Sequence, residues 1–205
     1  MTVRAVVFDV GNVLYHWNMR KLFAKLIHNV DELDWFLAHV VTEEWHFQHD
    51  AGRPLAEMVP ERIAEFPAYA DHINAYATRF VETIPGPVAG MIALVDALAA
   101  RKVPIFGITN FGAEFWDQFR PTAPVFDHFT DIIVSGVEKL IKPDPAIYAL
   151  ALRRFGLAPG EGLFVDDRLE NIESAAANGF VGHHFKDAET LRSALNALSL
   201  LITAP

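Results

Sequence analysis

The chain has 205 residues, no cysteine and a formal net charge of −9. Without cysteine there are no disulfides, thiolate nucleophiles or thiolate metal sites, which leaves the chemistry to carboxylates, hydroxyls, imidazoles and lysines. The negative charge and the lack of a Lys/Arg cluster argue against a nucleic-acid surface. No uncharged apolar run reaches the roughly 18 residues of a membrane span, so we expect a soluble, cytoplasmic protein with no membrane partner.

The opening segment, residues 3–14, predicts a strand that ends on an acid. Residues 6–8 are β-branched or aromatic, which is typical of a parallel strand buried on both faces. Asp9 closes this strand, and Gly11 has no Cβ, so the backbone can approach a ligand closely. Ligands of open α/β sheets bind beyond the carboxyl ends of the strands, which makes Asp9 a candidate catalytic residue.

The next segment, residues 18–84, has only helical hydrophobic spacing and contains no plausible strand. The run Pro85-Gly86-Pro87 follows it and is the clearest break in the sequence. We therefore expect a block of helices that ends at a return hinge.

From Val88 onward, helical and strand patterns alternate. This alternation predicts an α/β fold, a Rossmann-like parallel sheet with helices on both faces. The expected helices cover residues 91–101, 113–120, 146–155, 169–178 and 189–200, and the expected strands cover residues 104–108, 131–134, 163–165 and 181–185.

The spacing of two strand ends locates an insertion. Asp9 and Thr109 lie 100 positions apart, whereas one strand-helix-strand unit needs about 30 residues. The excess is the helical block. We therefore expect a catalytic core of residues 1–15 and 86–205, and a helical cap of residues 16–85 that lies over the edge of the sheet where Asp9 is found.

Four signals fall at strand ends or in an adjoining loop. Each has an ordinary explanation as a turn, a helix start or a helix cap, but together they share the ligand-binding edge of one sheet. The signals are Asp9 with Gly11, Thr109 with Asn110, Lys142 in IKPDPAIY, and Asp166 with Asp167 in FVDDRLEN.

The residue types indicate phosphoryl chemistry. A carboxylate nucleophile beside two more carboxylates requires a cation, and oxygen-only ligands suit Mg²⁺, which would also hold a phosphate. Thr109 and backbone N–H groups near Gly11 and Asn110 could bind phosphoryl oxygens, while Lys142 offsets the negative charge.

The motifs FDVGNVL, ITN, KPD and VDDRLEN, in this order, resemble the haloacid dehalogenase superfamily over nearly the whole chain. The resemblance implies strand order 3-2-1-4-5, a cap inserted after the first motif and an aspartyl-phosphate intermediate. It implies that Asp9 is the nucleophile and a magnesium ligand, that Gly11 offers its carbonyl to the metal, and that Thr109 and Lys142 hold the phosphoryl group. Asp167 aligns with the principal metal-binding acid, and Asp166 is then a second ligand, direct or through water.

One position departs from the family. Most family phosphatases carry a second Asp two residues after the nucleophile as general acid and base, and here that position is Gly11. The subset that reads FD-x-GNV includes bacterial sugar-phosphate phosphatases of the α-D-glucose-1-phosphate phosphatase type. The chain also resembles these through TNFGAEFW and HFQHDAG, which suggests that the glycine slows the enzyme without abolishing its activity.

The cap is expected to set the substrate. His46 and His49 lie three positions apart on a predicted helix, so one of them could contact substrate or supply the missing proton; packing, surface placement and a zinc site are the alternatives.

We predict a magnesium-dependent phosphohydrolase of a small phosphorylated metabolite, such as a sugar phosphate, that acts as a monomer or a homodimer. A metal-free 2-haloacid dehalogenase and a non-catalytic ligand-binding or regulatory protein on the same scaffold are the alternatives.

Overall fold

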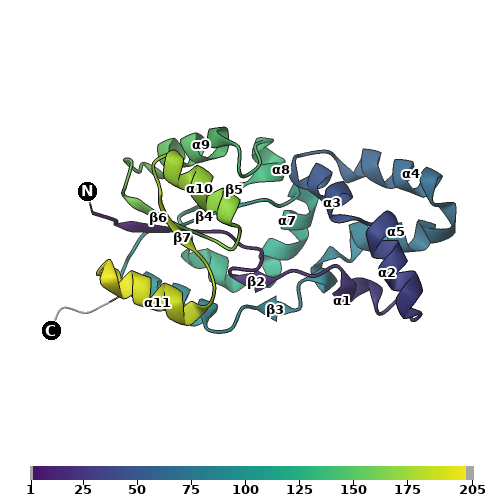
Figure 1. Ribbon diagram of the computed structural model, residues 1–205, viewed down its shortest axis with the longest axis horizontal. Helices are drawn as coiled ribbons and strands as arrows, with labels where there is room; N and C mark the ends of the chain where they lie inside the picture. The colour runs from purple at the N-terminus through teal and green to yellow at the C-terminus, as the bar shows by residue number, and fades with distance from the viewer. Residues whose placement is uncertain (1, 202–205) are drawn as a thin grey trace.

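The computed structural model describes residues 2–201, and a five-stranded parallel sheet forms its centre (Figure 1). The order β5-β4-β1-β6-β7 confirms the predicted 3-2-1-4-5 arrangement, with the first strand in the middle. The strands are β1 (Ala5–Phe8), β4 (Ile105–Thr109), β5 (Asp131–Val134), β6 (Gly162–Asp166) and β7 (Val181–His184).

Helices cover both faces of the sheet, as the alternating pattern predicted. Side chains of β1 alternate between the faces: Ala5 and Val7 pack in the apolar cluster with α9 and α10, whereas Val6 and Phe8 pack in the cluster with α6 and α11. The core helices are α6 (Met91–Ala100), α7 (Ala113–Phe119), α8 (Ser135–Glu138), α9 (Pro145–Phe155), α10 (Leu169–Ala177) and α11 (Ala188–Ala197), with the 3₁₀ turns η3 (Arg120–Thr122) and η4 (Pro124–His128).

The predicted boundaries of the core elements lie within one residue of the observed ones, except that the end of the last helix differs by three residues. The last helix was expected to reach residue 200, but it ends at Ala197, because Leu198 caps it and Ser199 has a positive φ of 62° that breaks helical geometry. The final strand ends at His184 rather than at residue 185.

A block of helices lies beyond the carboxyl ends of the strands, at the right of Figure 1. We call this block the helical cap. Its elements are α1 (Arg20–Phe23), α2 (Val30–His39), α3 (Glu43–Asp50), α4 (Leu55–Glu65), η1 (Pro67–Tyr69), α5 (Ala70–Thr78) and η2 (Phe80–Thr83).

Local sequence explains where two of the cap helices begin. The side chain of Asn29 accepts a hydrogen bond from the Glu32 backbone N–H at the start of α2, and Thr42 does the same for Trp45 at the start of α3. Buried cap side chains such as Phe36 belong to the same apolar cluster as the α6/α11 face of the sheet. The cap and the core are therefore joined by continuous packing.

The chain enters and leaves the cap through one small ribbon, which the sequence did not predict. β2 (Tyr15–His16) pairs antiparallel with β3 (Gly86–Pro87). Val88 N–H also donates to Leu14 O at 2.9 Å. Within residues 2–201, no helix has the length and apolarity needed to cross a membrane.

Candidate active site

Asp9 lies at the carboxyl end of the central strand. Its backbone N–H donates to Val165 O at 2.9 Å, which extends the ladder to β6, and its Oδ1 accepts from the Val10 N–H at 2.7 Å. Only 11% of the side chain is exposed. The backbone thus fixes one carboxylate oxygen at the edge of the sheet where ligands bind.

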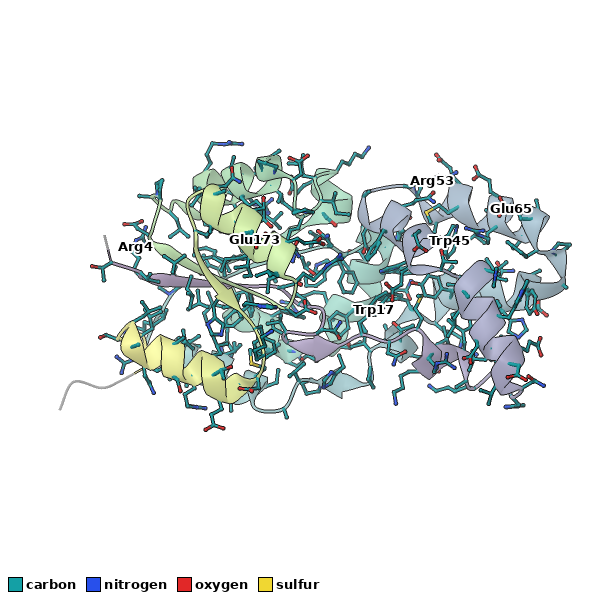
Figure 2. The ribbon with its side chains drawn as sticks, in the orientation of Figure 1. Arg4, Trp17, Trp45, Arg53, Glu65 and Glu173 are labelled. Atoms are coloured by element: carbon teal, nitrogen blue, oxygen red, sulfur yellow. The ribbon has the colours of Figure 1, made fainter. Side chains whose placement is uncertain are left out.

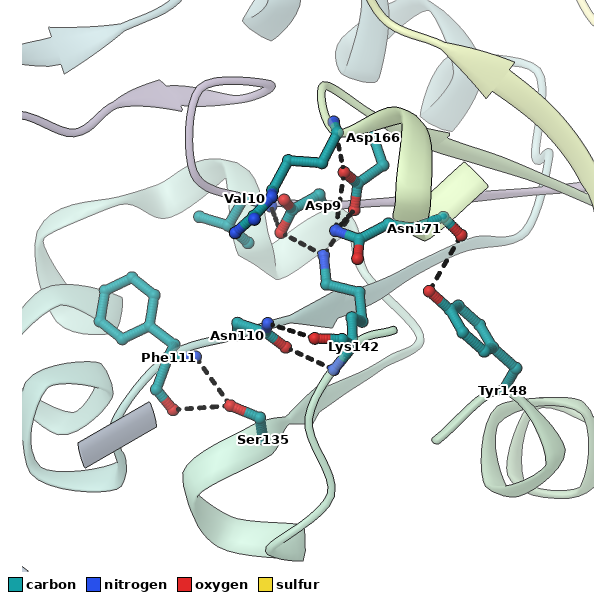
Figure 3. Close-up of polar contacts among 10 residues, drawn as sticks. Asp9, Val10, Asn110, Phe111, Ser135, Lys142, Tyr148, Asp166 and Asn171 are labelled. Carbon is teal, nitrogen blue, oxygen red and sulfur yellow. Dashed lines mark hydrogen bonds and ion pairs between the residues drawn. The ribbon is translucent and has the colours of Figure 1, made fainter. Parts of the chain in front are cut away.

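Lys142 reaches Asp9 from the loop before α9 (Figure 3). Its Nζ lies 2.9 Å from Oδ1 of Asp9 and 2.7 Å from Oδ2 of Asp166, and its side chain is 1% exposed. Asn110 holds this loop in place, because its Oδ1 accepts from the Lys142 N–H at 2.8 Å and its Nδ2 donates to Lys142 O at 3.0 Å. The Asn110 side chain therefore positions Lys142, while the backbone of Asn110 stays available to bind a ligand.

Asp166, at the end of β6, is completely buried. Besides Lys142, it accepts hydrogen bonds from Arg168 N–H at 2.8 Å and from Nδ2 of Asn171 at 3.0 Å. Tyr148 in turn donates its hydroxyl to Asn171 O at 3.0 Å. Most of the hydrogen-bonding capacity of this carboxylate is used within the protein.

Asp167 is half-buried and lines a cavity together with Asp9. Asp9, Asp166 and Asp167 each offer a carboxylate oxygen, and these oxygens all lie within 4.8 Å of one another. Three acids face one lysine, so negative charge is in excess.

The pKa values of two of these acids are raised, by burial first and then by the neighbouring negative charges. Burial raises the pKa of Asp9 to about 7, Lys142 opposes the rise, and the neighbouring Asp166 and Asp167 add to it. Burial, followed by the charge of Asp166, also raises the pKa of Asp167. A divalent cation would relieve both shifts, and the oxygen-only donor set fits Mg²⁺.

Thr109 ends β4 next to Asp9 and is 1% exposed. Within residues 2–201 its Oγ1 has no hydrogen-bond partner. Buried hydroxyls are nearly always paired, so this group suits an oxygen ligand brought by substrate.

A cavity of about 610 Å³ extends from Asp9 toward the cap. Gly11 lines it, and a Cβ built on Gly11 would meet nothing within 4 Å. Figure 2 shows Trp17 at the junction of the sheet and the cap. Core residues that line the cavity include Asp9, Asn110, Phe111, Lys142, Asp167, Arg168 and Asn171, and those of the cap side include Trp17, Leu37, Glu43, His46, Phe47 and Asp50.

The two candidate histidines lie in different places. His46 lines the cavity, but its Nε2 lies 3.2 Å from Oδ2 of Asp50 and its Nδ1 lies 2.7 Å from the Tyr76 hydroxyl. Both ring nitrogens already have partners, so the structure shows no free nitrogen that could supply the missing proton.

His49 does not line the cavity. Its Nδ1 lies 2.9 Å from Arg53 O, and its ring packs so tightly on Gly112 that a Cβ there would lie 2.0 Å from it. A spacing of three makes His46 and His49 neighbours on α3, but the His49 ring packs on Gly112 and does not reach the cavity, whereas Asp50, four positions after His46, lines it. Asp50 was not among the residues predicted from the sequence. Its spacing of four from His46 is the signal that could have identified it as a cavity residue.

Two proteins named as phosphatases are similar in sequence to this chain. The sesquiterpene phosphatase astK of Aspergillus oryzae is 28% identical over 187 residues, which cover 91% of this chain and 92% of that protein. A phosphoglycolate phosphatase of Yersinia pseudotuberculosis is 32% identical over 132 residues, which cover 64% of this chain and 54% of that protein.

Solved structures share the fold. A haloacid dehalogenase family enzyme of Bacteroides thetaiotaomicron superposes with a TM-score of 0.75 at 21% identity, over 95% of this chain and 99% of that one. The same enzyme in complex with magnesium and inorganic phosphate gives a TM-score of 0.69 at 20% identity, over 90% and 95% of the two chains.

The family model for haloacid dehalogenase-like hydrolases matches residues 3–179, a span that includes Asp9, Thr109, Lys142, Asp166 and Asp167. This chain therefore belongs to the haloacid dehalogenase-like hydrolases.

Proposed function

We propose that the protein is a magnesium-dependent phosphohydrolase that acts on a small phosphorylated metabolite through an aspartyl phosphate on Asp9. One observation carries the proposal. Asp9 lies at the base of a substrate-sized cavity, paired with Lys142 at 2.9 Å, in a cluster of three carboxylates with too few positive charges.

The chemistry follows from this arrangement. Asp9 attacks phosphorus in line with the leaving oxygen, the P–O bond to the alcohol breaks, and the alkoxide takes its proton from water. A second water then attacks phosphorus, which frees inorganic phosphate and restores Asp9. Lys142 offsets charge on the transferring group, and Thr109 and the backbone N–H groups near Gly11 and Asn110 bind its oxygens.

The residues that would hold magnesium are Asp9, Asp167 and the Gly11 carbonyl, with Asp166 as a second-rank ligand because it is already bonded to Lys142 and Asn171. When bound, the ion would stabilise the negative charge that develops on the phosphoryl oxygens.

The comparisons support this proposal by analogy. Two relatives are named phosphatases, and a protein of the same fold binds magnesium and inorganic phosphate. The sugar-phosphate substrate suggested by the sequence stays a prediction.

One feature favours a second candidate, the metal-free 2-haloacid dehalogenase. Gly11 supplies no general acid, and a halide leaves without a proton. The crowded pair Asp166-Asp167 counts against it, because a metal-free reaction has no need for two further carboxylates beside Asp9.

One assay separates these functions. Release of inorganic phosphate from p-nitrophenyl phosphate and other monoesters is measured beside release of halide from 2-haloacids, with Mg²⁺ and with EDTA. Wild-type protein is compared with Asp9→Asn and with Asp127→Asn, whose side chain is exposed, pairs with Arg120 and does not line the cavity.

We expect phosphate release that needs Mg²⁺, disappears in Asp9→Asn and is unchanged in Asp127→Asn. Halide release that is insensitive to EDTA would establish the dehalogenase instead. Ligand binding without any Asp9-dependent release would establish the regulatory protein.

A further inference from the structure

We propose that the substrate is the phosphate monoester of an apolar, uncharged alcohol, whose carbon chain lies against Trp17, Leu37 and Phe47. The inference rests on the proposed phosphohydrolase function and names its substrate class.

The first observation is the apolar wall of the cavity on the cap side. Trp17 in the link after β2, Leu37 on α2 and Phe47 on α3 all line the cavity, and all three keep part of their surface exposed. Phe80 and Phe111 line the cavity behind them and are almost completely buried. Three separate elements thus present apolar surface to one space above Asp9.

Among the residues of this wall, Phe47 gives the strongest indication of an apolar ligand. Within residues 2–201 it is not among the partly buried residues that pack against the apolar core. The His46 ring lies 5.9 Å from its ring, and the guanidinium of Arg168 lies 5.8 Å from it. An apolar side chain without core packing gains about 25 cal/mol for each Å² that a ligand covers. A substrate chain in the cavity would provide that cover.

The second observation is that two polar side chains beside this wall bond to the protein itself. Both nitrogens of His46 have partners, as described above, and Oδ1 of Asn18 accepts from the Arg20 N–H at 2.9 Å. Trp17 Nε1 and Oδ1 of Asp50 have no hydrogen-bond partner within residues 2–201. An apolar leaving group leaves the bonds of His46 and Asn18 intact, whereas a hydroxylated one competes with them.

Charge in the cavity points to a neutral leaving group. The guanidinium of Arg20 pairs with Asp34, and that of Arg168 lies 2.5 Å from Glu170. Glu43 lines the same side, so a second anionic group on the substrate would meet a carboxylate and two arginines that are already paired.

The size of the cavity sets a lower limit on the alcohol. About 610 Å³ lies within the range of cavities that enclose drug-sized ligands, and a two-carbon leaving group would leave the apolar wall in water. The wall therefore suits a chain of about six carbons or more.

The test is a chain-length series. Values of kcat/KM for phosphate release are measured with Mg²⁺ for ethyl, butyl, hexyl and octyl phosphate, farnesyl monophosphate and D-glucose 1-phosphate. Hexyl phosphate and glucose 1-phosphate form the decisive pair, because both leaving groups have six carbons and only one is apolar. Burial of one methylene is worth about 0.8 kcal/mol, so we expect up to about a fourfold rise in kcat/KM for each added methylene until the cavity is full.

Variants assign the effect to the wall. Phe47→Ala should flatten the chain-length dependence, mainly through KM, and Phe47→Leu should restore much of it. Trp35→Ala is the matched control, because Trp35 is an aromatic residue of the same cap that is 43% exposed and does not line the cavity. The dependence of kcat/KM on chain length in Trp35→Ala should equal that of wild type.

Two outcomes would contradict the inference, and they differ. If glucose 1-phosphate or ethyl phosphate is hydrolysed at least as efficiently as hexyl phosphate, the substrate class is wrong while the phosphohydrolase stands. If folded wild-type protein hydrolyses none of the esters, the proposed function fails and the substrate class fails with it.

Discussion

Lys142 Nζ lies 2.9 Å from Oδ1 of Asp9, and both side chains are almost entirely shielded from water. The same ammonium also neutralises Asp166 at 2.7 Å. One buried cation therefore serves two buried anions, and the third acid, Asp167, adds to the imbalance.

Lys142→Met should destabilise the protein and abolish turnover. Loss of one partner from a buried ion pair costs about 3 to 5 kcal/mol, because the remaining charges stay desolvated. We expect urea unfolding at pH 8 to show a fall of about 3 kcal/mol and a smaller fall at pH 5, where the acids take up protons. Lys21→Met, at an exposed position of α1, is the control and should behave like wild type.

Metal-free protein should lose stability as the pH rises. The pKa of Asp9 in the folded state, about 7, lies above its ordinary 3.8, so the folded protein binds this proton more tightly than the unfolded chain. Asp9 therefore contributes stability fully below pH 4, and this contribution is lost as the pH rises through 7. Each pKa unit is worth about 1.4 kcal/mol, so the total is about 4 kcal/mol at most.

Urea titrations in EDTA between pH 4 and 8 measure this loss. Asp9→Asn should lack that component of the pH dependence. Addition of Mg²⁺ to the wild-type protein at pH 8 should restore the stability that it loses in EDTA. An identical pH profile in Asp9→Asn would show that Asp9 does not hold the raised pKa.

Gly11→Asp should accelerate turnover. The position lines the cavity, its Cβ would meet nothing within 4 Å, and Gly11 does not have a positive φ, so the side chain fits without strain. A positioned general acid is worth about 10²- to 10⁴-fold in rate. Gly11→Asn, which has the same shape without a transferable proton, should stay near the wild-type kcat, and equal rates for the two variants would count against acid catalysis.

Asp166 and Asp167 should separate in their effects. Asp166→Asn removes the acceptor that Lys142, Asn171 and the Arg168 N–H share, so we expect the free energy of unfolding to fall by about 2 kcal/mol or more. Asp167→Asn should not lower the free energy of unfolding, because within residues 2–201 this half-buried acid accepts no hydrogen bond from another side chain, and it should raise the Mg²⁺ concentration for half-maximal activity. Urea unfolding in EDTA and a Mg²⁺ titration of phosphate release measure the two effects.

The core half of the site could be predicted because strand ends constrain it. Asp9 follows a short apolar strand, Thr109 and Asp166 each end one, and parallel strands bring their carboxyl ends to one edge. The sheet topology confirms the predicted fold class and strand order, and the family match confirms the predicted family. The sharing of Lys142 between Asp9 and Asp166 was not predicted, because a loop lysine has no periodicity that gives its direction.

The cap side could not be predicted with the same success. Leu37 and Phe80 come from separate elements, α2 and η2, and their convergence depends on how short helices pack rather than on a pattern within either element. The ribbon of β2 and β3 was missed for a similar reason, since strands of two residues carry no alternation to detect.

That ribbon has an evolutionary consequence. Tyr15 pairs with Pro87 and His16 with Gly86, so the outgoing and incoming chains cross side by side at one place. The parts of the cap that do not pack on the core can be lengthened, shortened or exchanged while β1 and β4 keep their register. New substrate preferences can therefore arise by replacement of a single cassette, with the phosphate chemistry inherited intact.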